Sequence, residues 1–387
     1  MRIPRILALV LAGGKGSRLG ALTEKRVKPA LPVAGTYRLI DLALSNLAHS
    51  HISDVWVVQQ YLPHSLNVHL ANGRPWDLDR SHGGLQVLPP YEGASGEGFA
   101  EGNADSIYRQ KELIRQFAPD LVLVLSADHL YTINFLDVVD THLEKGADLT
   151  MVTTEVAEDP SRYGVVQVDD DGWVTGFDYK PEEPQGRLVA GEMFLYDAQK
   201  LLEALEELHA QHGQLEDYGH DLVPWFVAHR AVAEHRLHGY WMDLGTLQSY
   251  WTAHMQLLDG DGVILDDPGW PILSAQPQRV PARIAGSAQL HTSMVAAGAV
   301  VGGVVEHSVL GPGVVVEEGA TVRNCVLLDG VRVGPGVSLL NVVADVGAEI
   351  SGGSRRGSPA GVTLIGEDGT VATTEDFDRS AVLPDGV

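Results

Sequence analysis

The sequence predicts an α/β fold: a Rossmann-like, doubly wound, mostly parallel sheet, followed by a C-terminal left-handed parallel β-helix. Short apolar runs at 6–11, 55–58 and 121–125 alternate with helical patterns, which is typical of parallel strands covered by helices on both faces. Further along, aliphatic residues recur every six positions, as at Leu310 and Val316, with small residues between them. That period indicates a parallel β-helix.

The elements of the first part follow one another as strand, helix, strand. A helix is expected over 37–47, where apolar residues fall on one face, and another over 104–117, with Asn103 as its cap. Residues 71–103 are rich in glycine and proline and predict a long loop. The later elements expected are a helix over 133–145, strands over 149–154 and 188–196, a hairpin over 164–177, and helices over 198–211, 219–229 and 246–258.

Four segments are expected along the 387 residues. The first domain covers 1–258, a linker with four prolines covers 259–283, the β-helix covers 284–350, and 351–387 form a weakly patterned tail. The formal net charge of −24 argues against nucleic acid or an anionic membrane surface as a partner. The single cysteine, Cys325, and the lack of any apolar run near 18 residues predict a cytoplasmic protein without a membrane span.

A glycine-rich turn follows the first strand and is surrounded by cations. Gly13, Gly14 and Gly16 allow a close backbone approach, and five basic residues lie within 15–28. In so acidic a chain this pattern predicts a phosphate site. The stretch is not a P-loop, because it contains no G-x-x-x-x-G-K-[ST] run. It is not a dinucleotide fingerprint either, because Leu19 stands where a third glycine would be needed.

Two aspartates are candidate ligands for Mg²⁺. Asp128 directly follows the strand at 121–125, and ligands of such sheets bind at the carboxyl ends of the strands. Asp243 follows an aromatic pair and precedes Leu-Gly-Thr. A hard divalent ion prefers carboxylate oxygens, and nucleotide substrates bring such an ion with them.

The run Leu11-Ala-Gly-Gly-Lys-Gly-Ser-Arg-Leu19, with Lys28-Pro-Ala30, resembles the signature of sugar-1-phosphate nucleotidylyltransferases. The segments 127–129 and 240–246 resemble the two metal-holding motifs of that family. Within it, 35–41, 60–61 and 270–272, together with the β-helix, look like the ADP-glucose pyrophosphorylase subfamily, and the resemblance extends to about residue 350.

The resemblance implies that a sugar 1-phosphate, most simply glucose 1-phosphate, attacks the α-phosphate of a nucleoside triphosphate such as ATP. It also implies Mg²⁺ on Asp128 and Asp243, a homo-oligomer (tetramer or dimer), and a part in glycogen or starch synthesis. The implied site residues are catalytic Arg18, Lys28 and Asp128; nucleotide-binding Leu11, Ala12, Gly13, Gly14, Gly16, Gly102 and Asp105; sugar-phosphate-binding Gly164, Lys180, Glu192 and Asp243; and the effector residue Lys25.

Several positions depart from the subfamily pattern. Leu88-Pro-Pro-Tyr-Glu-Gly93 replaces a Pro-Ala-Gln-Gln run, Asn103 replaces a threonine, and Tyr179 stands where a glutamate is customary. Val189–Phe194 and Met242 differ as well. The alternatives left open are the same reaction on another glucose-like or cyclitol 1-phosphate, a non-catalytic regulatory subunit, and an acyltransferase built on the β-helix.

Overall fold

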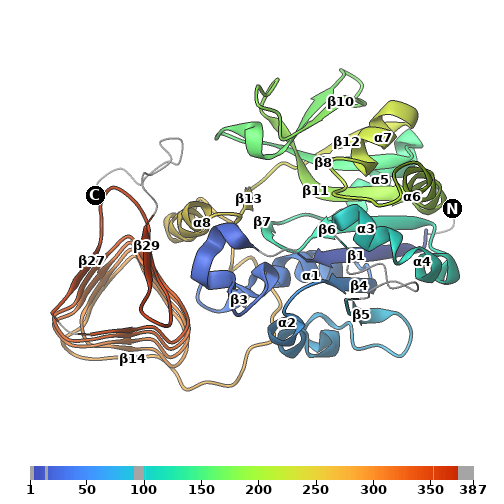
Figure 1. Cartoon of the computed structure of the whole chain (residues 1–387). Coiled ribbons are helices and arrows are strands. Elements are labelled where there is room, and N and C mark those ends of the chain that lie inside the picture. Colours follow the sequence, from blue (N-terminus) through green and yellow to red (C-terminus); the bar gives the residue numbers. More distant parts are fainter. Residues whose placement is uncertain (1–3, 14–15, 91–99, 101, 352, 374–387) are drawn as a thin grey trace. The chain divides into compact units, whose positions relative to one another are not determined.

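The computed structural model describes residues 4–13, 16–90, 100, 102–351 and 353–373 (Figure 1). The chain folds into two compact units that do not follow chain order. Unit 1 consists of 1–14, 43–127 and 132–241, and unit 2 of 15–42, 128–131 and 242–387. The segments 15–42 and 128–131, which carry predicted site residues, therefore group with the C-terminal part of the chain.

Unit 1 is built around one sheet, which confirms the doubly wound prediction but makes the sheet mixed. Strands β6 (Leu121–Ser126), β1 (Ile6–Ala12), β4 (Asp54–Gln59) and β5 (Gly84–Leu88) are neighbours in that order and run parallel. On the other side of β6, β11 (Leu188–Asp197) runs antiparallel and also pairs with β8 (Leu149–Glu155). The hairpin β9 (Gly164–Val168) and β10 (Val174–Tyr179) extends this side, and β12 (Val232–Arg236) lies parallel to β8.

Helices cover both faces of this sheet, as the apolar strands require. Leu7 and Leu9 of β1 point into a core that includes Leu201 and Phe226, while Ala8 and Val10 are equally buried on the opposite face. Helices with residues in unit 1 are α1 (Leu39–His49), α2 (Pro63–Leu70), α3 (Asn103–Tyr108), α4 (Lys111–Phe117), α5 (Phe135–Lys145), α6 (Ala198–His212) and α7 (Leu222–His229).

Three local expectations were wrong in unit 1. The region 71–103 is not all loop, because β5 forms within it after a short 3-10 helix, η3 (Ala71–Trp76). Gly84 permits this strand: its φ is +90°, and a Cβ there would stand 2.4 Å from the Leu78 carbonyl oxygen. The helix expected over 104–117 is divided at Arg109–Gln110, and Asn103 lies inside it, with Gly102 as the cap.

Unit 2 is dominated by a hexapeptide-repeat β-helix, which Figure 1 shows nearly end-on as a triangle of three walls. Each wall is a stack of short parallel strands, and in-register pairs such as Val316 with Val333 and Val322 with Leu339 point their side chains into the core. The walls comprise β14 (Arg283–Ile284), β17 (Val300–Val301), β20 (Val315–Val316), β23 (Arg332–Val333) and β26 (Glu349–Ile350); β15 (Gln289–His291), β18 (Val304–Glu306), β21 (Thr321–Arg323), β24 (Ser338–Leu340) and β27 (Arg355–Gly357); and β16 (Met294–Val295), β19 (Val309–Leu310), β22 (Val326–Leu327), β25 (Val342–Ala344) and β28 (Thr363–Ile365).

The stacks continue beyond residue 350, where the sequence suggested a weakly patterned tail. β27 and β28 each pair in parallel with the coil before them, and β29 (Val371–Thr373) closes the third wall by an antiparallel pair. The aliphatic spacing hides this last coil because β27 carries the exposed pair Arg355 and Arg356.

Unit 2 also contains elements that precede the β-helix in the chain. They are η1 (Ser17–Thr23), η2 (Lys28–Ala30), β2 (Pro32–Val33), β3 (Tyr37–Arg38), β7 (His129–Tyr131), β13 (Trp241–Asp243, of which Trp241 falls in unit 1) and α8 (Leu247–Asp259). The buried Trp251 of α8 donates from Nε1 to the Asn324 carbonyl oxygen at 2.7 Å. Arg26 forms an ion pair with Asp345 at 2.5 Å, with both side chains largely buried.

Helix α8 also holds the chain that follows Lys28. His254, which is fully buried, accepts a hydrogen bond at Nε2 from the Ala34 backbone N–H at 3.2 Å. Its Nδ1–H donates to the Tyr250 carbonyl oxygen at 2.7 Å, and the Tyr250 hydroxyl donates to the carbonyl oxygen of Pro32. The turn after η2 is therefore fixed by side chains of one helix. Across the described residues, no helix is long and apolar enough to cross a membrane.

Candidate functional site

In unit 2, Lys28 bridges the two predicted metal ligands. Its Nζ donates to Oδ2 of Asp128 and to Oδ1 of Asp243, both at 2.8 Å. The lysine side chain is only 10% exposed, and the two aspartates are 23% and 19% exposed. Three residues that lie far apart in the chain thus form one charged group.

Mutual attraction shifts the pKa values of Lys28 and Asp243 toward their charged forms. Burial would lower the pKa of Lys28, but the Asp128 and Asp243 carboxylates outweigh burial and raise it. Burial would raise the pKa of Asp243, but the Lys28 ammonium and then His129 outweigh burial and lower it. Near neutral pH the Lys28 ammonium and the Asp243 carboxylate therefore both stay charged.

Local structure explains how these side chains meet. Lys28 opens η2, where Pro29 fixes the backbone at the start of the helix. Asp128 directly precedes β7 and Asp243 ends β13, and these two strands form a two-stranded sheet. After β13, Thr246 caps α8 in a reciprocal capping box with Ser249, which anchors the end of the segment that carries Asp243.

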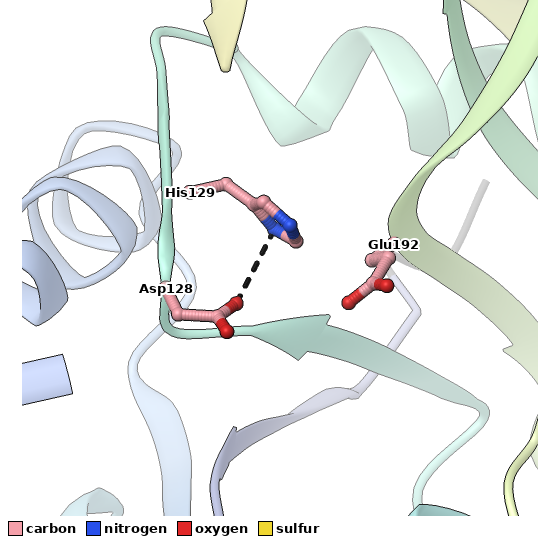
Figure 2. Close-up of side chains that lie close together, drawn as sticks. All are labelled: Asp128, His129 and Glu192. Carbon is pink, nitrogen blue, oxygen red and sulfur yellow. Dashed lines mark ion pairs between the residues drawn. The ribbon is translucent and has the colours of Figure 1, made fainter. Parts of the chain in front are cut away.

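His129 lies against both carboxylates. Its Nδ1 is 3.5 Å from Asp128 Oδ1, the ion pair drawn in Figure 2, and its Nε2 is 3.6 Å from Asp243 Oδ1. The side chain is 4% exposed. The sequence gives no sign of a role for this histidine, because a histidine directly after an aspartate carries no spacing signal of its own.

The donor set fits a divalent cation. Two ionised carboxylates that both reach one cation, the Lys28 ammonium, offer the hard oxygen ligands that such ions prefer. Asp128 and Asp243 are the residues that would hold the ion.

The other residues of the glycine-rich stretch are placed as follows. Gly16 has φ +58° and precedes η1, on which Arg18 is exposed, and Thr23 donates from its hydroxyl to the Gly16 carbonyl oxygen at 2.9 Å. Lys25 forms an ion pair with Glu367 of the last β-helix coil at 2.5 Å. Gly14 lies outside the described residues.

In unit 1, the predicted nucleotide residues lie at the carboxyl end of β1 and at the start of α3. Leu11 and Ala12 end β1, and Gly13 follows them directly. A Cβ on Gly13 would stand 2.6 Å from Oε1 of Gln60, so this glycine is needed for the close approach of the Gln60 side chain. The Nε2 of Gln60 also donates to the hydroxyl of Ser106 on α3.

Gly102 and Asp105 both have structural partners. Gly102 caps α3 in extended conformation, and a Cβ there would collide with the Glu216 carbonyl oxygen at 1.9 Å. The Asp105 carboxylate accepts a hydrogen bond from Arg109 Nε at 2.9 Å, and both side chains are buried. Beside them, Gln60, Tyr61, Pro89 and Arg109 line a small open hollow.

The predicted sugar-phosphate residues of unit 1 lie on β9, β10 and β11. Gly164 begins β9 and packs against the ring of Phe177, 2.5 Å from where its Cβ would be. Lys180 directly follows β10 and Glu192 lies within β11, with φ values of +49° and +56°. These φ values lie in the left-handed region, where residues other than glycine are strained, and such strain clusters at functional sites. Asp243, the fourth predicted sugar-phosphate residue, is in unit 2.

A loop that sequence reasoning did not single out connects these residues. The Glu216 carbonyl oxygen accepts from the Ala104 N–H at 3.1 Å, and Asp217 Oδ2 accepts from the Tyr179 hydroxyl at 2.7 Å. Burial and the neighbouring Glu192 carboxylate raise the pKa of Tyr218, so its hydroxyl keeps its proton and donates to Glu192. An acidic, aromatic and glycine triplet between two helices, 217–219, is the only signal that could have drawn attention to it.

The model of the nucleotidyl transferase family matches residues 7–260, about two thirds of the chain, and this chain belongs to that family of enzymes. A GlmU-like C-terminal hexapeptide model matches 279–362. Among curated relatives, a glucose-1-phosphate adenylyltransferase of Clostridium acetobutylicum is 40% identical over 312 residues, which cover 80% of this chain and 82% of that protein. Glucose-1-phosphate adenylyltransferases of Bacillus thuringiensis and Bacillus mycoides are each 37% identical over 382 residues, covering 98% of this chain and 97% of theirs.

These matches confirm the resemblance stated from the glycine-rich stretch and the β-helix, and they confirm nucleotidyl transfer between a sugar phosphate and a nucleoside triphosphate as the type of reaction. Nucleotidyl transferases of this kind use a divalent metal ion, which agrees with the acidic group around Lys28.

Proposed function

We propose that this chain transfers the adenylyl group of ATP to glucose 1-phosphate, with Mg²⁺ held by Asp128 and Asp243, and releases ADP-glucose and pyrophosphate. The observation that carries the proposal is the pairing of Lys28 with both aspartates in a member of the nucleotidyl transferase family. The relatives named glucose-1-phosphate adenylyltransferase support ATP and glucose 1-phosphate as the substrates.

The reaction needs positioning and charge neutralisation rather than a covalent nucleophile on the enzyme. A phosphate oxygen of glucose 1-phosphate attacks the α-phosphorus of ATP; the new P–O bond forms as the bond to pyrophosphate breaks, and pyrophosphate leaves with the electron pair. The bound ion would supply positive charge beside the reacting phosphates.

The chain's own cations have separate tasks in this proposal. Lys28, held between two carboxylates, is oriented by its partners and would stabilise the charge of the phosphates beside them. Arg18, exposed on η1, stabilises the triphosphate and its leaving group. Lys180 holds the phosphate of the sugar, while Glu192 and Gly164 shape its surroundings.

The test is a panel of triphosphates against several sugar and cyclitol 1-phosphates, scored by pyrophosphate release. ATP with glucose 1-phosphate should give the highest kcat/KM. Asp128→Asn and Asp243→Asn should each lower kcat by about 10²-fold, the scale of losing one strong electrostatic stabiliser. Asp170→Asn, in an exposed turn, is the matched control and should leave kcat unchanged. Near-normal turnover of both site variants at saturating Mg²⁺ would refute the metal assignment.

We also propose the expected domain boundaries, a homo-oligomer, and an effector role for Lys25. Lys25 is 67% exposed and its partner Glu367 is 48% exposed, and surface pairs of this kind contribute little to stability. An anionic effector can therefore displace Glu367 at little cost. Lys25→Ala should abolish activation or inhibition by anionic metabolites without changing basal activity, and light scattering of the intact chain tests for the oligomer.

A further inference from the structure

Tyr179 links the proposed sugar-phosphate lysine to a carboxylate. Its hydroxyl donates to Asp217 Oδ2 at 2.7 Å and accepts from Lys180 Nζ at 2.6 Å. The three groups therefore form a chain from carboxylate through neutral hydroxyl to ammonium, all within unit 1. Hydrogen bonds that involve an ionised partner are the stronger kind, and bonds in series polarise one another.

The ring of Tyr179 is held on several sides by the loop that carries Asp217. A Cβ on Gly219 would stand 2.2 Å from a ring carbon, so the loop backbone lies directly against the ring. The His220 ring meets it edge-on at 4.6 Å between centroids, and the Phe177 ring is roughly parallel to it at 6.4 Å. The hydroxyl is thus fixed in position by packing before it meets the lysine.

Lys180 itself has a fixed backbone and an uncompensated charge. Its N–H donates to the Tyr163 carbonyl oxygen at 2.9 Å, and its φ of +49° is kept by these surroundings. Among the described residues, no carboxylate forms an ion pair with its ammonium. Tyr179 therefore lets Asp217 orient the lysine through a neutral group, and the positive charge stays available to an anion.

We propose that Tyr179 is a positioning residue for the sugar phosphate: its hydroxyl, oriented by Asp217, holds the Lys180 ammonium where the phosphate of the sugar binds. This inference rests on the proposed function, because it takes Lys180 as the phosphate-binding group. Tyr179 acts through Lys180, so it should set the affinity for the phosphorylated sugar and leave the affinity for the triphosphate unchanged.

The first test compares Tyr179→Phe with the natural protein in steady-state kinetics. The variant keeps the ring and loses the hydroxyl, so KM for glucose 1-phosphate should rise about tenfold, the scale of one hydrogen bond to a charged group. The KM for ATP and kcat should stay within about twofold. Tyr163→Phe is the matched control, since it removes a hydroxyl that donates to Glu158 at 2.7 Å, and it should change neither KM.

A double-mutant cycle then separates positioning from general damage. Lys180→Ala should raise KM for glucose 1-phosphate, and adding Tyr179→Phe to it should cause no further rise. Calorimetric titration of each variant with glucose 1-phosphate gives a second readout that does not depend on turnover, and the dissociation constants should show the same non-additivity.

The outcomes distinguish the two proposals. If Lys180→Ala leaves the affinity for glucose 1-phosphate unchanged, the assignment of the lysine fails and the inference falls with it. If Lys180→Ala weakens binding while Tyr179→Phe does not, or if the two effects add, only the inference is overturned. If Tyr179→Phe does not fold, Asp217→Leu can be used in its place, because it removes the acceptor of the Tyr179 hydroxyl. For either variant, a rise in KM for ATP equal to the rise in KM for glucose 1-phosphate would count against the inference.

Discussion

Protonation of His254 should lower the stability of the protein in mild acid, and the substitution His254→Gln isolates this effect. Burial lowers the pKa of His254 to about 4, against about 6.5 in an unfolded chain. The neutral ring accepts from the Ala34 N–H and donates to the Tyr250 carbonyl oxygen, and a protonated ring could no longer accept. His254→Gln keeps an acceptor in reach and removes the titration.

The sign and size follow from linkage. Because the folded pKa lies below the unfolded one, the contribution of His254 is fully present above about pH 6.5 and is lost as the pH falls toward 4. Between pH 7.5 and pH 5 the difference in proton uptake amounts to about 2 kcal/mol in the free energy of unfolding. Histidines other than His254 are shared by both proteins and cancel in the comparison.

Urea unfolding at a series of pH values, followed by circular dichroism and tryptophan fluorescence, measures this difference. The natural protein should lose about 2 kcal/mol more than His254→Gln over this range, with unchanged slope against urea. Activity after incubation at pH 5 should fall earlier in the natural protein, because the turn that His254 holds follows Lys28. Parallel pH profiles of stability for the two proteins would refute the reasoning.

Three further predictions concern unit 2. Arg26→Ala should destabilise the fold by about 3 kcal/mol, because it leaves the buried Asp345 carboxylate without its partner, whereas replacing both residues by leucine should cost less; thermal unfolding decides between these outcomes. Burial raises the pKa of the Cys325 thiol to about 12, so a disulfide reagent should modify it only once urea unfolds the chain, and rapid modification of the native protein would contradict the burial. The β-helix is expected to be a platform for assembly and regulation. Truncation after residue 280 should therefore expose Trp251, remove the acceptor of its indole N–H and reduce solubility and oligomer size, which size-exclusion chromatography would show. An unchanged elution profile and intact regulation would argue against this role of the β-helix.

Much of the fold could be predicted because its signals are local. The apolar runs of β1 and β6 and the six-residue period of the β-helix are repeated patterns that need no knowledge of distant contacts. β5 was not predicted because glycines and prolines flank it, and these residues also mark loops. The last coil escaped because Arg355 and Arg356 occupy one of its strands.

The candidate site divides in the same way. The glycine-rich stretch and the two aspartates carry motif signals, whereas the contacts of His129 with both carboxylates depend on how three segments meet in space. The bond from Tyr179 to Asp217 joins residues 38 positions apart, and no spacing in the sequence announces it. In the sequence, Tyr179 stands out only because the related subfamily has a glutamate at this position. Its contacts with Asp217 and Lys180 are visible only in the structure.

The grouping of 15–42 with the C-terminal half has a consequence for building chimeras. An exchange of everything after the linker would import a foreign β-helix under Arg26 and Lys25, whose present partners are Asp345 and Glu367. A working hybrid needs residues 15–42, helix α8 and the β-helix from the same donor, so that Arg26 and Lys25 keep their own carboxylate partners. The crossover points in this enzyme are therefore set by contacts in space, and a single cut along the chain does not respect them.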